Sequence, residues 1–196
     1  MVLASGNPGK LREFSLLLAP ADFTIEAQSR FGVLPPAETG DSFVANALIK
    51  ARHAAAVTGL PALADDSGLE VDALGGAPGV HSTRYAGEPS NADANIDKLL
   101  TALANTADDR RGARFHCVIA FVRGADDPAP LLASGHWQGR ILRARRGTGG
   151  FGYDPVFEDP ATGLSAAELH GERKNTLSHR GIALRALLAQ LRLANF

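Results

Sequence analysis

Two adjacent carboxylates, Asp65 and Asp66, follow the apolar run "LPALA" and precede Ser67 and Gly68. Neighbouring acids repel one another, so this placement favours a positive partner nearby. Glu38 is a third acidic candidate, just before a predicted helix. Because Mg²⁺ takes carboxylate oxygens together with substrate phosphate oxygens, these three acids are candidate metal ligands. The alternative is structural: Asp65 caps a turn, while Asp66 and Glu38 are solvated.

The stretch "VLASGNPGKLREF" combines a short strand, a Gly/Pro turn and the start of a helix. Backbone N–H groups at a helix N-terminus attract anions. Lys10 adds a cation in the first helical turn, where it opposes the helix dipole unless an anion compensates. The spacing differs from a P-loop, since only Asn7 and Pro8 separate Gly6 from Gly9. A tight turn without a ligand is the alternative.

A basic cluster lies in "ERKNTLSHRG", where Lys174, His179 and Arg180 surround the start of the last predicted helix. Cations are unfavourable at that end of a helix. The lysine and arginine side chains carry only hydrogen-bond donors and suit phosphate or carbonyl oxygens. Together with Lys10 and Lys50 they are positive counterparts for the carboxylates.

The segment "GGFGYDP" places Phe151 and Tyr153 among glycines and beside Asp154. An exposed aromatic ring can stack on a nucleobase, worth about 1–3 kcal/mol per base. The alternative is a loop anchored by two buried aromatic side chains.

Composition limits the other possibilities for this 196-residue chain, which has 45% hydrophobic and 21% charged residues. A net charge of −1 provides no overall field that attracts nucleic acid, and "RARR" at 143–146 is expected to be a solvated basic face. The single cysteine, Cys117, excludes an internal disulfide and is expected to be a buried thiol. Without a signal-peptide core or a run of roughly 20 apolar residues, we expect a cytoplasmic protein with no membrane contact.

Mixed strand and helix patterns predict an α/β fold. We expect strands at 1–5, 61–65, 113–122, 130–137 and 138–144, helices at 10–20, 41–57, 91–104 and from about 178, and a loop at 147–165. No repeat or linker divides the chain, so residues 1–196 are expected to form a single domain.

Five blocks together resemble the HAM1-like inosine triphosphate pyrophosphatase family. They are "ASGNPGK", "ETGDSFVANALIKARHAA", "LADDSGLEVDALGGAPGVHSTRYAG", "GTGGFGYDPVF" and "ERKNTLSHRG", in the family's order and nearly from end to end. The resemblance implies an elongated mixed central sheet flanked by helices, with two lobes and a cleft between them. It also implies a homodimer that hydrolyses ITP, dITP or XTP to the monophosphate and pyrophosphate with Mg²⁺.

The resemblance also implies roles for particular residues. Asp66 is the expected catalytic carboxylate and a metal ligand, with Glu38 and Asp65 as the further ligands. The triphosphate is expected to bind Ser5, Gly6, Asn7, Pro8, Gly9 and Lys10. Nucleotide contacts are expected from Ser67, Phe151, Gly152, Tyr153, Asp154, Lys174, His179 and Arg180.

Chemical reasoning leaves two alternatives open. A related Maf-type pyrophosphatase would act on pyrimidine or modified nucleotides. A nucleotide-binding module would keep the same residues without turnover. Either way, the carboxylates at Glu38 and Asp66 and the cations Lys10 and Lys174 are expected to converge on one phosphate-bearing ligand.

Overall fold

The strands in the described part of the computed structural model, residues 1–18 and 23–194, form one seven-stranded sheet in the order β2-β1-β3-β4-β5-β6-β7. They are β1 (Val2–Leu3), β2 (Glu26–Ala27), β3 (Ala62–Val71), β4 (Gly112–Val122), β5 (Leu131–Ile141), β6 (Phe157–Asp159) and β7 (Leu164–Ser165). The helices are α1 (Pro8–Leu18), α2 (Phe43–Thr58), α3 (Ala92–Ala102), α4 (Gly171–Leu177) and α5 (His179–Leu193).

Strand directions make this a mixed sheet. β1 pairs in parallel with both β2 and β3, whereas β6 pairs antiparallel with β5 and with β7. The predicted α/β class with a mixed sheet and flanking helices is therefore confirmed.

The chain divides into two compact units. Unit 1 comprises Met1–Asp66, Cys117–Gly135 and Arg180–Phe196, and unit 2 comprises Ser67–His116 and His136–His179. Strands β3, β4 and β5 contribute residues to both units.

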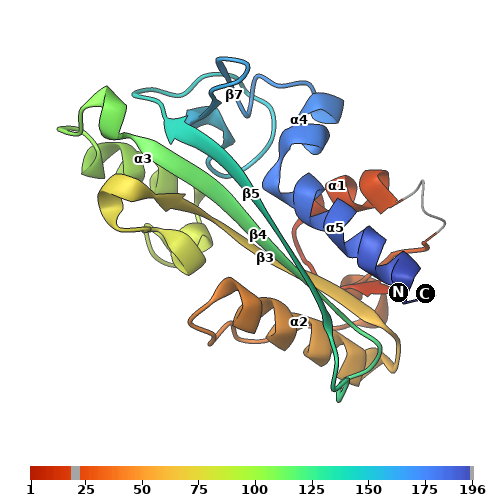
Figure 1. Cartoon of the computed structure of the whole chain (residues 1–196). Helices are drawn as coiled ribbons and strands as arrows, with labels where there is room; N and C mark the ends of the chain where they lie inside the picture. The colour runs from red at the N-terminus through yellow and green to blue at the C-terminus, as the bar shows by residue number, and fades with distance from the viewer. Residues whose placement is uncertain (19–22, 195–196) are drawn as a thin grey trace. The chain divides into compact units, whose positions relative to one another are not determined.

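In unit 1, helices cover both faces of the sheet. Helix α2 lies against one face, and α1 and α5 lie against the other (Figure 1). On the α1 and α5 face, Leu63 and Ile119 from the sheet share a buried cluster with Phe14 and Leu187 from the helices. Helix α2 turns alanines such as Ala47 inward, so it can approach its face of the sheet closely.

In unit 2, the core is aromatic. Phe115 and Phe157 pack with ring centroids 4.5 Å apart, and Trp137 lies 5.1 Å from Phe157. The indole of Trp137 donates a 3.0 Å hydrogen bond to Asp159, so its polar group is satisfied inside the core.

Several predicted boundaries differ from the structure. β3 was expected to end at residue 65, but it continues to Val71, so the acid pair lies in mid-strand. The strands predicted at 130–137 and 138–144 are one strand, β5, because buried and exposed side chains alternate without a break through Trp137 and Gln138. The expected loop at 147–165 contains the short strands β6 and β7.

Helix α4 was not predicted, since seven residues give too little periodicity. The helix boundary expected near Pro20 lies outside the described residues. Within those residues, no helix is both long and apolar enough to span a membrane.

Candidate functional site

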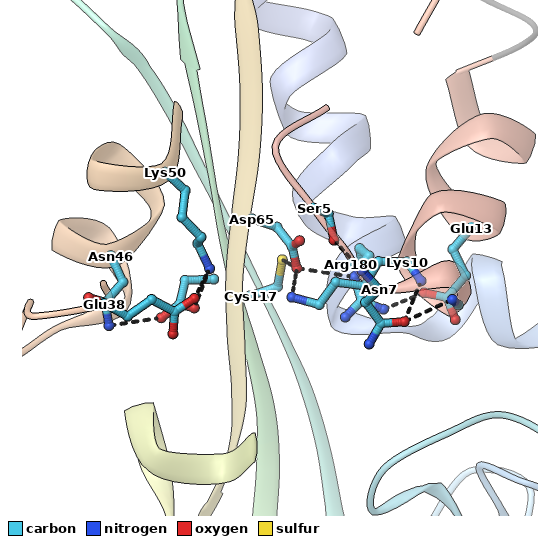
Figure 2. A network of polar contacts seen from close by, with 12 residues as sticks. Ser5, Asn7, Lys10, Glu13, Glu38, Asn46, Lys50, Asp65, Cys117 and Arg180 are labelled. Carbon is cyan, nitrogen blue, oxygen red and sulfur yellow. Dashed lines mark hydrogen bonds and ion pairs between the residues drawn. The ribbon is translucent and has the colours of Figure 1, made fainter. Parts of the chain in front are cut away.

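Asp65 and Asp66 lie on opposite faces of β3, because consecutive side chains of a strand alternate. Asp65 meets Lys10 and Arg180, and Asp66 meets Lys50. Figure 2 shows Lys50 on one side of the strand and Lys10 and Arg180 on the other. The strand thus separates two carboxylates that are adjacent in sequence and gives each its own cationic partner.

On the α1 and α5 side, Asp65 is surrounded by positive charge. Its Oδ2 lies 2.9 Å from Lys10 Nζ and accepts a 3.3 Å hydrogen bond from Arg180 Nε. Arg180 also donates to Glu13, and both Asp65 and Arg180 are buried. Burial alone raises the pKa of Asp65, but the charges of Lys10 and Arg180 outweigh it and hold that pKa well below its usual range. Asp65 is therefore a carboxylate that stays ionised.

The turn before α1 is organised by Asn7. Its Oδ1 accepts hydrogen bonds from the backbone N–H groups of Gly9 (2.8 Å) and Lys10 (3.2 Å), as an N-cap does. The N–H of Asn7 itself donates to Ser5 Oγ. These three amide groups have partners within the turn, so the main positive feature here is the Lys10 side chain. Asp65 supplies the anion that compensates this first-turn lysine.

Two further members of the predicted phosphate loop, Gly6 and Pro8, are exposed. The loop therefore presents backbone to solvent directly beside the Asn7 cap. This exposure leaves room for a ligand to approach the turn.

On the α2 side, one ammonium group joins two carboxylates. Lys50 Nζ donates to Asp66 Oδ1 at 2.7 Å and to Glu38 Oε1 at 2.9 Å. Burial raises the pKa of Asp66, the negative charge of Glu38 raises it further, and Lys50 opposes both without cancelling them. Burial lowers the pKa of Lys50, yet the carboxylates of Asp66, Asp65 and Glu38 raise it above its ordinary value. Lys50 is therefore charged, and Asp66 is a more basic carboxylate than Asp65.

The contacts of these acids indicate which of them fit a divalent metal ion. Within 1–18 and 23–194, no group of three or more His, Cys, Asp or Glu side chains is placed to hold a metal ion. Glu38 and Asp66 nevertheless converge on a single cation, the Lys50 ammonium. Two carboxylates completed by substrate phosphates are a usual Mg²⁺ arrangement, so this pair fits such an ion. Asp65 is bound to Lys10 and Arg180 on the other face.

Cys117 lies in β4 beneath Asp65, with Sγ 4.0 Å from Asp65 Oδ2. The thiol is buried, and burial followed by the charge of Asp65 raises its pKa strongly. Because a thiol is nucleophilic only as the thiolate, the expected structural role of Cys117 is supported.

In unit 2, the aromatic loop forms a second polar cluster. Asp154 Oδ2 accepts hydrogen bonds from Lys174 Nζ (2.7 Å) and from the N–H of Phe151 (2.8 Å). The same ammonium lies 5.0 Å from the centroid of the Phe151 ring. Gly150 and Gly152 have φ angles of +73° and +59°, a conformation that side chains other than glycine rarely adopt. The loop is thus tightly folded around Asp154.

The remaining predicted residues of unit 2 differ in exposure. Tyr153 is buried and donates a 2.8 Å hydrogen bond to the carbonyl of Ser82, so it is an anchor of the loop. His179 is buried and stacks on Phe115 with ring centroids 4.8 Å apart. Ser67, next to Asp66 in β3, is half-buried.

Two residues of the unit 1 network were not among the predicted site residues. Glu13 binds Arg180, and Asn46 contacts Asp66. Each lies one helical turn from a predicted residue, Glu13 after Lys10 and Asn46 before Lys50. That i, i+3 or i, i+4 spacing is the signal in the sequence that points to them.

The mixed sheet and the charged groups on both faces of β3 define an α/β protein whose site suits a phosphate-bearing ligand. The chain belongs to the Ham1 family, whose model matches residues 1–190. This confirms the family expected from the sequence.

Individual relatives match over nearly the whole chain. A dITP/XTP pyrophosphatase of Methylococcus capsulatus is 60% identical over 98% of this chain and 96% of its own length. The structure of a HAM1 protein from Coxiella burnetii matches with a TM-score of 0.90 and 51% identity, covering 97% of each chain. The Staphylococcus aureus Ham1 protein matches with a TM-score of 0.86 and 39% identity over 98% of each chain.

Proposed function

We propose that this protein hydrolyses non-standard purine nucleoside triphosphates, ITP, dITP, XTP and dXTP, to the nucleoside monophosphate and pyrophosphate. Its Ham1 family membership and the similarity to a relative named dITP/XTP pyrophosphatase support this activity. The structural observation that carries the proposal is the shared cation of Glu38 and Asp66, which brings an acidic pair and a lysine to one point.

Release of pyrophosphate requires water to attack the α-phosphorus while the β,γ portion departs. We assign Asp66 to orienting that water, because its carboxylate is an acceptor fixed by Lys50 beside Glu38, the second proposed metal ligand. Its Oδ1 accepts a 2.7 Å hydrogen bond from Lys50, which anchors one end of the carboxylate. The residues that would position the attacking water therefore come from α2 and β3.

Glu38 and Asp66 would hold a Mg²⁺ ion, which when bound neutralises phosphate charge and lowers the pKa of bound water. Lys10 and Lys50 provide positive charge for the triphosphate and the leaving group. The assignment of Asp65 as a third ligand stays a prediction. Its contacts support a different role, which is holding Lys10 and Arg180 in place.

Base recognition is proposed for unit 2. Phe151 offers an aromatic surface beside Lys174, whose ammonium donates hydrogen bonds and suits a keto oxygen of the base. His179 and Ser67 stay predicted contacts of the nucleotide. Arg180 also stays a predicted contact, although its donors serve Asp65 and Glu13 in this structure.

Three wider predictions accompany this function. Each compact unit consists of separate chain segments, so neither unit can be cut out as one piece, and we propose that residues 1–196 act as a single domain. The homodimer and the cytoplasmic location also stay predictions. Measurement of the molecular mass in solution tests the homodimer.

A triphosphate panel with separate pyrophosphate and orthophosphate assays tests the activity. We expect pyrophosphate from dITP, ITP and XTP, little from ATP and GTP, and no turnover after EDTA. Orthophosphate as the first product contradicts the proposal. Preference for pyrimidine nucleotides would indicate the Maf-type activity, and tight binding without turnover would indicate a binding module.

A further inference from the structure

Asn46 lies wholly inside unit 1, with 0% of its surface exposed. It is on α2, one turn before Lys50. A buried amide needs partners for both of its ends. Its Oδ1 accepts a 2.8 Å hydrogen bond from the N–H of Gly40, and its Nδ2 lies 3.4 Å from Asp66 Oδ2. Because the N–H group of Gly40 can only donate, it faces the amide oxygen, and the NH₂ group of Asn46 points toward Asp66.

Gly40 permits this arrangement because it has no side chain. A Cβ atom there would lie 2.7 Å from Asn46 Oδ1 and 2.7 Å from the Cβ of Ala45. Glu38 is two residues before Gly40. The Asn46 side chain therefore connects Asp66 to the segment that carries its partner carboxylate, Glu38.

Asp66 is consequently held at both oxygens. Lys50 contacts Oδ1 at 2.7 Å, and Asn46 contacts Oδ2 at 3.4 Å. Two donors from successive turns of one helix define the plane of the carboxylate, whereas one donor would leave it free to rotate.

We propose that Asn46 is a positioning residue, which orients the Asp66 carboxylate toward the attacked phosphate and holds it beside Glu38. This inference rests on the proposed pyrophosphatase activity. It predicts that loss of the amide donor lowers turnover without weakening the binding of substrate.

Asn46→Asp is the decisive variant. It is nearly the same size and keeps an oxygen for Gly40, but it presents an acceptor instead of a donor to Asp66. We expect kcat for dITP to fall about 10- to 100-fold. KM should stay within about threefold, since the lost interaction acts on the reacting group rather than on ground-state binding.

Binding of Mn²⁺, followed by electron paramagnetic resonance of the free ion, gives a readout that does not depend on turnover. Asn46→Asp adds a carboxylate beside Glu38 and Asp66, so its Mn²⁺ affinity should equal or exceed that of the wild type. A variant that had merely lost its structure would lose metal binding and turnover together. Reduced turnover with preserved Mn²⁺ binding is therefore the result expected for a positioning residue.

Asn95 provides a matched control in unit 2. It is also a buried helical asparagine, whose Oδ1 accepts from the N–H of Ala86 and whose Nδ2 donates to the carbonyl of Thr83. Asn95→Asp therefore makes the same chemical change at a backbone contact. It should lower thermal stability while leaving kcat within about threefold of the wild type.

Four results decide the inference. A kcat for Asn46→Asp within about threefold of the wild type overturns it, as does an equal fall in kcat for Asn95→Asp. Weakened Mn²⁺ binding in Asn46→Asp also overturns it. If Asn46→Asp does not fold, Gly40→Ala displaces the amide from its other end and must lower kcat in the same way. Failure of the wild type itself to release pyrophosphate from dITP refutes the proposed function instead.

Discussion

The two faces of β3 place the same residue type in opposite electrostatic conditions. Asp65 has two cations beside it, and its pKa is lowered despite burial. Asp66 shares one cation with Glu38, and its pKa is raised. Adjacent acids whose environments drive their pKa values apart are a sign of divided roles. These opposite shifts support the proposed division, in which Asp65 stabilises the fold and Asp66 takes part in the chemistry.

The difference follows from the number of charges on each face. On the Asp65 face, Lys10 and Arg180 meet the carboxylates of Asp65 and Glu13. On the Asp66 face, a single lysine serves two acids and leaves one negative charge in excess. That excess would be compensated when a cation arrives with the substrate. The Asp65 face is compensated without a ligand.

The largest effect should come from Asp66→Asn. An amide cannot replace the charged carboxylate as a metal ligand and as the acceptor that orients the attacking water, so kcat should fall by about 10²- to 10⁴-fold. Stability should change by no more than about 1 kcal/mol, because the variant removes a charge whose burial is unfavourable and Lys50 keeps Glu38. Initial rates of pyrophosphate release and urea unfolding measure the two quantities. An active variant would remove Asp66 from the chemistry.

Asp65→Asn should have the opposite pattern. It removes the partner that Lys10 and Arg180 share, and breaking a buried ion pair costs about 3–5 kcal/mol. The free energy of unfolding in urea should fall by that amount, far more than in Asp66→Asn. If the two variants were equally stable, the division between the faces would be wrong.

Sequence reasoning could find the charged residues but not their faces. Asp65, Asp66 and Lys10 were recognisable because acids beside an apolar run and a lysine in a first helical turn are locally unfavourable. Each of these unfavourable charges is compensated by an opposite charge from a residue distant in the chain. To place Asp65 and Asp66 on opposite faces, one must know that β3 continues to Val71. The polar residues in the middle of the strand hid this continuation.

The residues that were missed carry weaker signals. Asn46 is an uncharged residue inside a helix, and nothing local shows that its amide is buried against Asp66. The short strands β6 and β7 have three and two residues, too few for an alternation pattern. Their pairing is fixed by tertiary contacts rather than by local sequence.

A smaller effect should appear at Asp127, another aspartate with an acidic neighbour, Asp126. Its carboxylate accepts hydrogen bonds from the Arg123 side chain and backbone, which lower its pKa. A lowered pKa in the folded state adds stability above the unfolded value of about 3.9, and this is lost as pH falls through the folded pKa. Asp127→Asn should therefore lose stability at pH 7 and flatten its acid dependence. The loss should be smaller than for Asp65→Asn, because Arg123 is exposed to solvent.

Asp126→Asn is the matched control, since this side chain is exposed. It should leave the urea unfolding curve unchanged at every pH, while kcat stays unchanged in both variants because neither residue belongs to the proposed site. The pair Asp126 and Asp127 would then contain one stabilising residue, as Asp65 is in its own pair, but no residue that affects kcat. The reactivity proposed for Asp66 would thus depend on its burial beside Glu38, because adjacency in the sequence alone would not create it. A loss of kcat in Asp127→Asn would contradict this distinction.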